Sequence, residues 1–420
     1  MTESNVTLKQ VIKLIQKVLN YMDPRLLDHG EKVAYILYKL LKVHKGYTDE
    51  EIYKLCTIAI FHDIGAYKVT ERDELLDIET NTPINHAVYG ALFIKYFSPL
   101  GDLNEVVLGH HLDSSYFEKE REIVIPKEAL MLGLADSIAL IHLKDNAIKQ
   151  SWLETKKKEY LEENVGLFQK VNKDDFISTR LSDNTYKEEL YSFFGRKVVY
   201  RDEIIAYAKM LAYSIDFMSE STLKHTIVVE AVSYEVAKLS GMSEEDAIRI
   251  KIAATIHDIG KIAIPIEILE KPGKLTTEEF EIIKSHAIIG YKILSDLNID
   301  DIRDIASAHH EKLDGTGYPF GLKGNEICKE ARIVAVSDIL SALMGVRSYK
   351  NEFNKEKIIQ ILRNMVENNK IDTHIVNLVI ENYDDIIEKV NFQTDELMSR
   401  YVTMKKQYKI LLSKLDSNNF

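Results

Sequence analysis

Apolar residues recur at intervals of three and four positions along most of the chain. The segments VTLKQVIKLIQKVL (6–19) and DAIRIKIAATIHDI (246–259) show this spacing, which places the apolar side chains on one face of an α-helix. The 420 residues include seven prolines, and no stretch sustains the apolar–polar alternation of a half-buried strand. The pattern predicts a nearly all-α protein.

The same arrangement of polar residues occurs twice. Residues 48–65 read TDEEIYKLCTIAIFHDIG, and residues 243–260 read SEEDAIRIKIAATIHDIG. Both begin with a capping-box pattern for a helix N-terminus and both end in HDIG. Each copy continues with H-A-V/I-x-G, a His-His pair and an apolar segment that contains one Asp. Polar residues at matched intervals predict a duplicated domain.

The repeat divides the chain into four parts. We expect a first helical domain over residues 1–142, a helical connector rich in Lys, Glu and Tyr over 143–215, a second helical domain over 216–385, and a C-terminal helix over 386–420. The last part contains LMSRYVTMKKQYKILLSKL, whose heptad-like spacing makes it a candidate surface for a homodimer.

Composition and charge indicate which binding partners and which cellular compartment suit the protein. The formal net charge of −12 disfavours a polymeric nucleic acid as partner, since such binding needs a basic surface. No apolar run approaches the roughly 20 residues of a membrane span, and the first residues do not resemble a signal peptide. The two cysteines, Cys56 and Cys328, form no CxxC pair. These features predict a cytoplasmic protein without a thiolate zinc site.

Each copy concentrates histidine and aspartate in a chain that has only 13 histidines. Imidazole with carboxylate suits iron, manganese or zinc, and seven such ligands fit a binuclear site with open positions for water and substrate. A single buried histidine is more often a core residue than a ligand, but the duplicated set favours metal. In the second copy the set is His225, His257, Asp258, His286, His309, His310 and Asp338. In the first copy it is His29, His62, Asp63, His86, His110, His111 and Asp136.

Two further motifs follow in the second copy. DGTGYP (314–319) directly follows His309-His310-Glu311, and its glycines and proline are typical of a tight loop, here at the mouth of the expected metal site. Arg347 and Lys350 share one face of a helix that follows Asp338, where they are candidate phosphate contacts. Lys261, three residues after Asp258, is a third basic candidate.

With these motifs, roughly residues 220–385 resemble the HD-GYP family of bacterial phosphodiesterases. The resemblance implies that a binuclear metal centre, often of iron, hydrolyses a cyclic dinucleotide, typically cyclic di-GMP, to a linear 5′-phosphorylated product. It assigns His225, His257, Asp258 and Asp338 to one metal and His286, His309 and His310 to the other, with Asp258 bridging. It also implies phosphate contacts for Lys261, Arg347 and Lys350, and it aligns Asp314, Gly317 and Tyr318 with the family's loop.

One position departs from the pattern of some members. They carry a Glu four residues before the first ligand histidine, which supports a third metal, whereas this chain has Ser221. We therefore expect two metals. The sequence leaves the proton donor to the leaving 3′ oxygen open between Lys261 and a water held by the metals.

The first copy resembles the broader HD superfamily. It matches all seven ligand positions, but Ala66 replaces the lysine and the GYP loop and basic pair are missing. We expect it to bind metal without cleaving cyclic dinucleotides. For the whole chain, three alternatives remain at this point: mixed cyclic GMP–AMP as the substrate, a phosphohydrolase of another nucleotide or phosphate ester, and a sensor that binds nucleotide and metal without turnover.

Overall fold

The computed structural model describes residues 6–22, 28–67, 84–118, 121–216, 220–269, 271, 273–295, 297–345 and 353–416. Within these ranges the backbone forms α-helices and short 3-10 helices, with one isolated bridge between Thr7 and Val198 and no β-strand. The predicted all-α fold is therefore confirmed. The chain separates into two compact units, a first unit of residues 1–203 and 403–420 and a second unit of residues 204–402.

In the first unit, the helices that carry the repeat are α2 (His29–His44), α3 (Asp49–Phe61), η2 (Ile64–Tyr67), α5 (Ile84–Phe97), α6 (Asn104–Leu108) and α7 (Glu128–Asp145). The others are α1 (Leu8–Met22), η3 (Gly101–Leu103), η4 (Ser114–Glu118), α8 (Gln150–Tyr160), α9 (Glu162–Val171), η5 (Lys173–Asp175), α10 (Phe176–Ser182) and α11 (Tyr186–Phe194).

In the second unit, the repeat is carried by α13 (Glu220–Leu239), α14 (Glu244–Ile256), η6 (Ile259–Ala263), α16 (Thr277–Leu294), α17 (Asp300–Ser307) and α18 (Lys329–Leu343). The second unit also contains α15 (Ile266–Leu269), η7 (Gly324–Glu326), α19 (Lys355–Glu367) and α20 (Thr373–Glu381). Two helices cross the boundary between the units, α12 (Arg201–Asp216) and α21 (Tyr383–Asp416).

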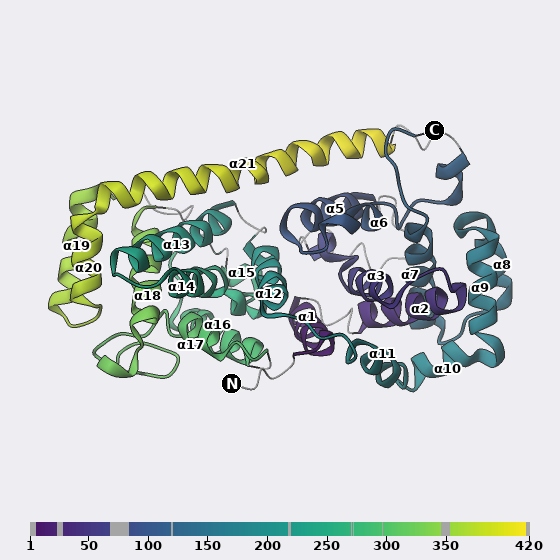
Figure 1. Ribbon diagram of the computed structural model, residues 1–420, viewed down its shortest axis with the longest axis horizontal. Helices are drawn as coiled ribbons and strands as arrows, with labels where there is room; N and C mark the ends of the chain where they lie inside the picture. The colour runs from purple at the N-terminus through teal and green to yellow at the C-terminus, as the bar shows by residue number, and fades with distance from the viewer. Residues whose placement is uncertain are drawn as a thin grey trace. The chain divides into compact units, whose positions relative to one another are not determined.

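The two copies of the repeat pack corresponding helices against one another, and Figure 1 labels the helices of each copy. In the first unit α2 packs against α3 and α7, and α5 packs against η2 and α6. In the second unit α13 packs against α14 and α18, and α16 packs against η6 and α17. Both sets of helices enclose an apolar core with fully buried side chains such as Ile36 and Phe61 in one unit and Val232 and Ile256 in the other. The sequence repeat therefore corresponds to a structural repeat.

Hydrogen bonds at the helix starts agree with the predicted caps. The Thr48 hydroxyl accepts from the Glu51 N–H, and the Glu51 carboxylate accepts from the Thr48 N–H, so the capping box at α3 is complete. At α14 the Ser243 hydroxyl accepts from the Asp246 N–H at 3.1 Å and donates to the Asp246 carboxylate. These bonds satisfy amide groups that the helix itself leaves unpaired.

The glycine of each HDIG motif lies directly against the next ligand-bearing helix. A Cβ atom on Gly260 would lie 1.9 Å from the His286 carbonyl oxygen, and one on Gly65 would lie 2.1 Å from the His86 carbonyl oxygen. Only glycine allows such a close approach of two backbones. This contact brings the His-Asp pair at the end of one helix next to the histidine of another.

The connector and the C-terminal helix are divided between the units. Helices α8 to α11 belong to the first unit, whereas most of α12 belongs to the second. In α21, Met404 and Leu415 are buried within the chain, while Val402 and Ile410 are exposed. The homodimer stays a prediction that rests on the heptad-like spacing of this segment. None of the described helices combines the length and apolar character that crossing a membrane requires.

The glycine contact predicts a difference between two neighbouring substitutions. Gly260→Ala should destabilise the second unit by about 1–3 kcal/mol, the usual cost of overpacking, because the added methyl group meets backbone that cannot move aside. Gly290→Ala is the matched control, since its Cβ would have no neighbour closer than 3.5 Å. Urea unfolding of both variants measures the difference, and equal stabilities would contradict the contact.

Candidate metal centres

The seven predicted ligands of the second unit converge from five places in the repeat. His225 lies in α13, His257 and Asp258 follow the end of α14, His286 lies in α16, His309 and His310 follow α17, and Asp338 lies in α18. Six of the seven are buried, and the His310 side chain is 22% exposed. The structure thus brings together every ligand that the sequence predicts for this site.

Backbone carbonyls orient three of the imidazole rings. Nδ1 of His257, His286 and His309 lies 2.6–2.7 Å from the carbonyl oxygen three residues earlier in each case. Because a carbonyl only accepts, each Nδ1 carries the proton. In the neutral ring, Nε2 then offers its lone pair to the interior of the site. This is the tautomer that metal-ligating histidines adopt through such outer contacts.

Asp258 lies between two groups of histidines. Its Oδ2 is 3.0 Å from His257 Nε2, and its Oδ1 is 3.3 Å from His286 Nε2. On one side, ligand atoms of His225, His257 and Asp258 lie within 4.8 Å of one another, and those of His286, His309 and His310 do so on the other. This placement suits a carboxylate that bridges two ions.

Asp338 closes the site from α18. Its Oδ1 lies 3.2 Å from His225 Nε2, and its Oδ2 lies 3.7 Å from His310 Nδ1. His225 differs from His257, His286 and His309, since its Nδ1 lies 2.9 Å from the hydroxyl of the buried Ser341 rather than from a carbonyl oxygen. Sequence reasoning did not single out Ser341, which lies one helical turn after Asp338.

Burial and neighbouring charges shift the pKa values of these groups in different directions. Burial lowers the pKa of His310 to about 3 and lowers that of His286. Burial also opposes protonation of His257, but the Asp258 carboxylate outweighs it and raises the pKa of that ring. Burial alone would raise the pKa of Asp258, yet His257 and Lys261 hold it well below its usual range. The site therefore combines an ionised Asp258 with imidazoles, His286 and His310, whose lowered pKa favours the neutral form that metal ligands need.

The first unit contains the same constellation. His29 Nε2 lies 3.0 Å from Asp136 Oδ1, and Asp63 lies between two rings, with Oδ2 3.2 Å from His62 Nε2 and Oδ1 3.5 Å from His86 Nε2. His86 Nε2 is 2.9 Å from His111 Nε2. Among the described residues of this unit, ligand atoms lie within 4.8 Å of one another in three overlapping groups, which are His29, His62 and Asp136; His62, Asp63 and His110; and His86, His110 and His111.

Orientation and charge in the first unit also suit a cation. Nδ1 of His62 and of His110 lies 2.8 and 2.6 Å from a carbonyl oxygen, so Nε2 faces the cluster. Burial and the neighbouring His62 lower the pKa of His110 to about 4. Burial opposes protonation of His62, but Asp63 and Asp136 raise its pKa to about 9. Among the described residues, the buried His110 Nε2 has no hydrogen-bond partner. Both clusters therefore fit transition metals, which these residues would hold through Nε2 and carboxylate oxygens.

Lys261 marks one difference between the two sites. Its ammonium group forms an ion pair with Asp258, and its side chain is 11% exposed. It therefore lies at the edge of the second cluster. The corresponding position in the first unit is Ala66.

The GYP loop (residues 311–327) is held at its inner end by Glu311. This buried carboxylate accepts hydrogen bonds from the backbone N–H groups of Phe320, Gly321 and Leu322 at 2.7–3.1 Å. The sequence contained a signal for this role, because Glu311 is a carboxylate between a ligand pair and a glycine-rich loop. Sequence reasoning nevertheless left it without a role.

The loop residues that the sequence selected have different positions. The Tyr318 ring lies 4.7 Å from the His310 ring, centroid to centroid, so it borders the metal cluster. Asp314 accepts hydrogen bonds from Thr316 and shapes the turn. A Cβ on Gly317 would lie 2.4 Å from the Glu311 Cα, so Gly317 allows the loop to fold back. The predicted phosphate contacts Arg347 and Lys350 lie outside the described residues.

Comparisons with known proteins agree with this organisation. Residues 26–141 and residues 206–375 each match a model of the HD domain family. Over 404 residues the chain is 25% identical to 3′3′-cGAMP-specific phosphodiesterase 1 of Vibrio cholerae, a match that covers 90% of this chain and 93% of the relative. Over 155 residues it is 44% identical to a cyclic di-GMP phosphodiesterase of Thermotoga maritima, covering 36% of this chain and 42% of that relative.

A solved structure shows the same fold over most of the chain. It is described as a cyclic GMP-AMP-specific phosphodiesterase of V. cholerae, and it aligns with a TM-score of 0.54 at 15% identity, covering 92% of this chain and 98% of that one. The chain belongs to the HD domain family and carries two HD domains in tandem. The second of these is of the HD-GYP type, with the HHEKLDGTGYP run at 309–319.

The two clusters predict separable metal contents. We expect His62→Ala/Asp63→Ala to lose part of the bound metal, because His62 and Asp63 form one candidate ligand group with His110, and His62 also belongs to the group with His29 and Asp136. Elemental analysis of anaerobically purified protein measures the loss. The control is His142→Ala, which removes a buried histidine of the same unit whose Nε2 lies 3.2 Å from the Ser178 carbonyl oxygen. Full metal content in the double variant would exclude a metal site in the first unit.

Proposed function

We propose that the second unit hydrolyses a cyclic dinucleotide at its His-Asp cluster and releases a linear 5′-phosphorylated product. The observation that carries the proposal is the joint placement of a seven-ligand cluster, Lys261 and Tyr318 at one site. The named activities of the V. cholerae and T. maritima relatives support the same reaction class.

The proposed reaction breaks one phosphodiester bond with one water molecule. Water adds to phosphorus, the bond to the 3′ oxygen breaks, and the 3′ oxygen takes a proton. Two metal ions, with iron or manganese as the leading choices, would activate water and neutralise the phosphate charge. His225, His257, Asp258 and Asp338 would hold one ion, and His286, His309 and His310 the other, with Asp258 shared.

Protein groups at the edge of the site complete the chemistry. The Lys261 ammonium beside Asp258 would stabilise negative charge that develops on the phosphate, since a fixed cation in a partly buried site is effective there. Tyr318, against His310, would contact the nucleotide beside the cleaved bond. Arg347 and Lys350, which the sequence predicts as phosphate contacts, would add two further cations.

The relatives support two substrates that differ in their bases. Cyclic di-GMP is supported by the 44% identity over 155 residues to the T. maritima enzyme. 3′3′-cGAMP is supported by the match over 93% of the V. cholerae enzyme's length, at 25% identity. We propose a guanine-containing cyclic dinucleotide, with these two in direct competition as substrates.

A nucleotide panel tests the reaction. The protein loaded with iron or manganese should linearise cyclic di-GMP, 3′3′-cGAMP or both, and chromatography should detect the 5′-phosphorylated product. His257→Ala and Asp258→Ala should abolish turnover, because each removes a ligand and Asp258 is shared. His62→Ala/Asp63→Ala should keep most of it, because the first unit lacks the lysine and the GYP loop. Absence of cyclic-dinucleotide turnover in the metal-loaded protein would refute the proposal.

The basic pair has its own test. Arg347→Ala should weaken substrate binding by roughly tenfold or more, because a hydrogen bond to a charged group contributes about 1.5–3 kcal/mol. Metal content should not change, since Arg347 is not among the ligands. Steady-state kinetics and metal analysis measure the two effects, and unchanged KM and kcat would mean that the residue is only a solvated surface charge.

A further inference from the structure

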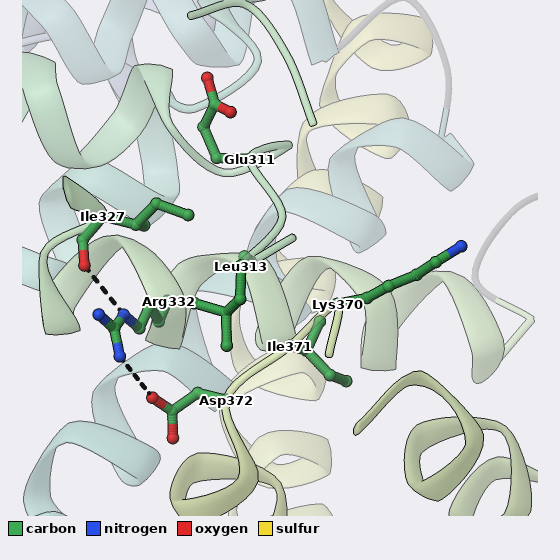
Figure 2. A pocket seen from close by; sticks show the side chains of 8 residues that line it. Glu311, Leu313, Ile327, Arg332, Lys370, Ile371 and Asp372 are labelled. Carbon is green, nitrogen blue, oxygen red and sulfur yellow. Dashed lines mark hydrogen bonds and ion pairs between the residues drawn. The ribbon is translucent and has the colours of Figure 1, made fainter. Parts of the chain in front are cut away.

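The outer end of the GYP loop is held by an arginine from the helix that carries Asp338. Arg332 of α18 donates from Nε to the Ile327 carbonyl oxygen at 2.9 Å and from Nη2 to the Gly324 carbonyl oxygen at 2.8 Å. Its Nη1 lies 2.9 Å from Asp372 Oδ2 (Figure 2). One guanidinium group therefore joins the loop to the segment between α19 and α20.

The two carboxylate oxygens of Asp372 have different partners. Oδ1 accepts hydrogen bonds from the N–H groups of His374 and Ile375 at 2.9 and 3.2 Å, which caps the start of α20. Oδ2 is left for Arg332. Two residues earlier, the Lys370 carbonyl oxygen accepts from the Leu313 N–H at 3.1 Å. Residues 370–372 thus attach to the loop directly near its start, and through Arg332 near its end.

The space between these attachments is closely filled. A cavity of about 10 Å³ is lined by Glu311, Leu313, Ile327, Arg332 and Asp372, among others (Figure 2). That volume matches one water molecule and excludes a nucleotide. Close packing leaves the loop little room to shift while both attachments remain in place. Glu311 therefore fixes the loop backbone at residues 320–322, and Arg332 fixes it at Gly324 and Ile327.

We propose that the Arg332–Asp372 ion pair is a positioning device for the GYP loop. It keeps Tyr318 against His310 at the metal cluster, so that residues 370–372, distant in sequence from every ligand, govern binding of the dinucleotide. This inference rests on the proposed function for its kinetic consequence. Neither residue touches the reacting atoms, and both act through the loop.

Asp372→Asn tests the device, because asparagine caps a helix as well as aspartate but carries no charge for Arg332. We expect KM for the cyclic dinucleotide to rise roughly tenfold, as displacement of a positioning group costs rate or binding steeply. Metal content should stay at the wild-type level. Hydrolysis of bis(4-nitrophenyl) phosphate, a small diester that needs the metal cluster but not the loop, should also stay unchanged.

Two further variants separate positioning from a general loss of structure. Asn354→Ala removes the cap of α19, where Asn354 accepts from the Lys357 N–H at 3.0 Å, and should leave KM unchanged. If Asp372 acts through Tyr318, the variant Tyr318→Ala/Asp372→Asn should bind substrate no more weakly than Tyr318→Ala. Additive losses would show that Asp372 acts by another route and would overturn the inference.

Amide hydrogen exchange provides a readout that needs no substrate. The amides of Phe320, Gly321 and Leu322 donate to Glu311, and they should exchange faster in Asp372→Asn than in the wild type. A wild-type protein inactive on every cyclic dinucleotide would refute the proposed function, while faster exchange in the variant would still support the positioning device. Unchanged exchange at these amides would overturn the device whatever the activity.

Discussion

A carboxylate buried among imidazoles is the interaction on which each HD domain depends. Asp258 is 6% exposed and Asp63 is 8% exposed, and an ionised carboxylate at such depth is costly unless opposite charge compensates it. In the second unit, His257 and Lys261 supply part of that charge and lower the pKa of Asp258. In the first unit, Asp63 and Asp136 instead raise the pKa of His62. Metal ions held by these carboxylates and imidazoles would complete the compensation.

Backbone contacts position the histidine and aspartate side chains in both units. The glycine of each HDIG motif allows the backbone to approach the next histidine helix more closely than a Cβ would permit. Carbonyl groups then hold Nδ1 of the rings in both units, so that Nε2 faces inward. Because these contacts use the main chain, they tolerate divergence of the surrounding side chains, and both copies keep them.

The two copies differ at the rim of the cluster rather than at its centre. In the second unit the GYP loop, which hydrogen bonds attach to Glu311 and Arg332, places Tyr318 against His310 of the candidate metal cluster. In the first unit the histidine pair is followed by η4, where Tyr116 donates to the Ile123 carbonyl oxygen at 2.8 Å and the Ser114 hydroxyl donates to the Lys158 carbonyl oxygen of α8. One scaffold thus supports a histidine–aspartate cluster bordered by a GYP loop and one without it.

The sequence by itself determined the helical class and the duplication and predicted the histidine–aspartate sets that the fold brings together, because helical periodicity and repeated polar spacings are local properties of the chain. It also indicated Lys261 and the GYP loop, which lie within a few residues of a ligand. Only the tertiary structure decided that the connector is split between the units, that Ser341 orients His225, and that Arg332 and Asp372 hold the loop. These contacts join residues far apart in the chain, and a lone Ser, Arg or Asp on a helix carries no pattern that distinguishes such a partner from a solvated surface residue.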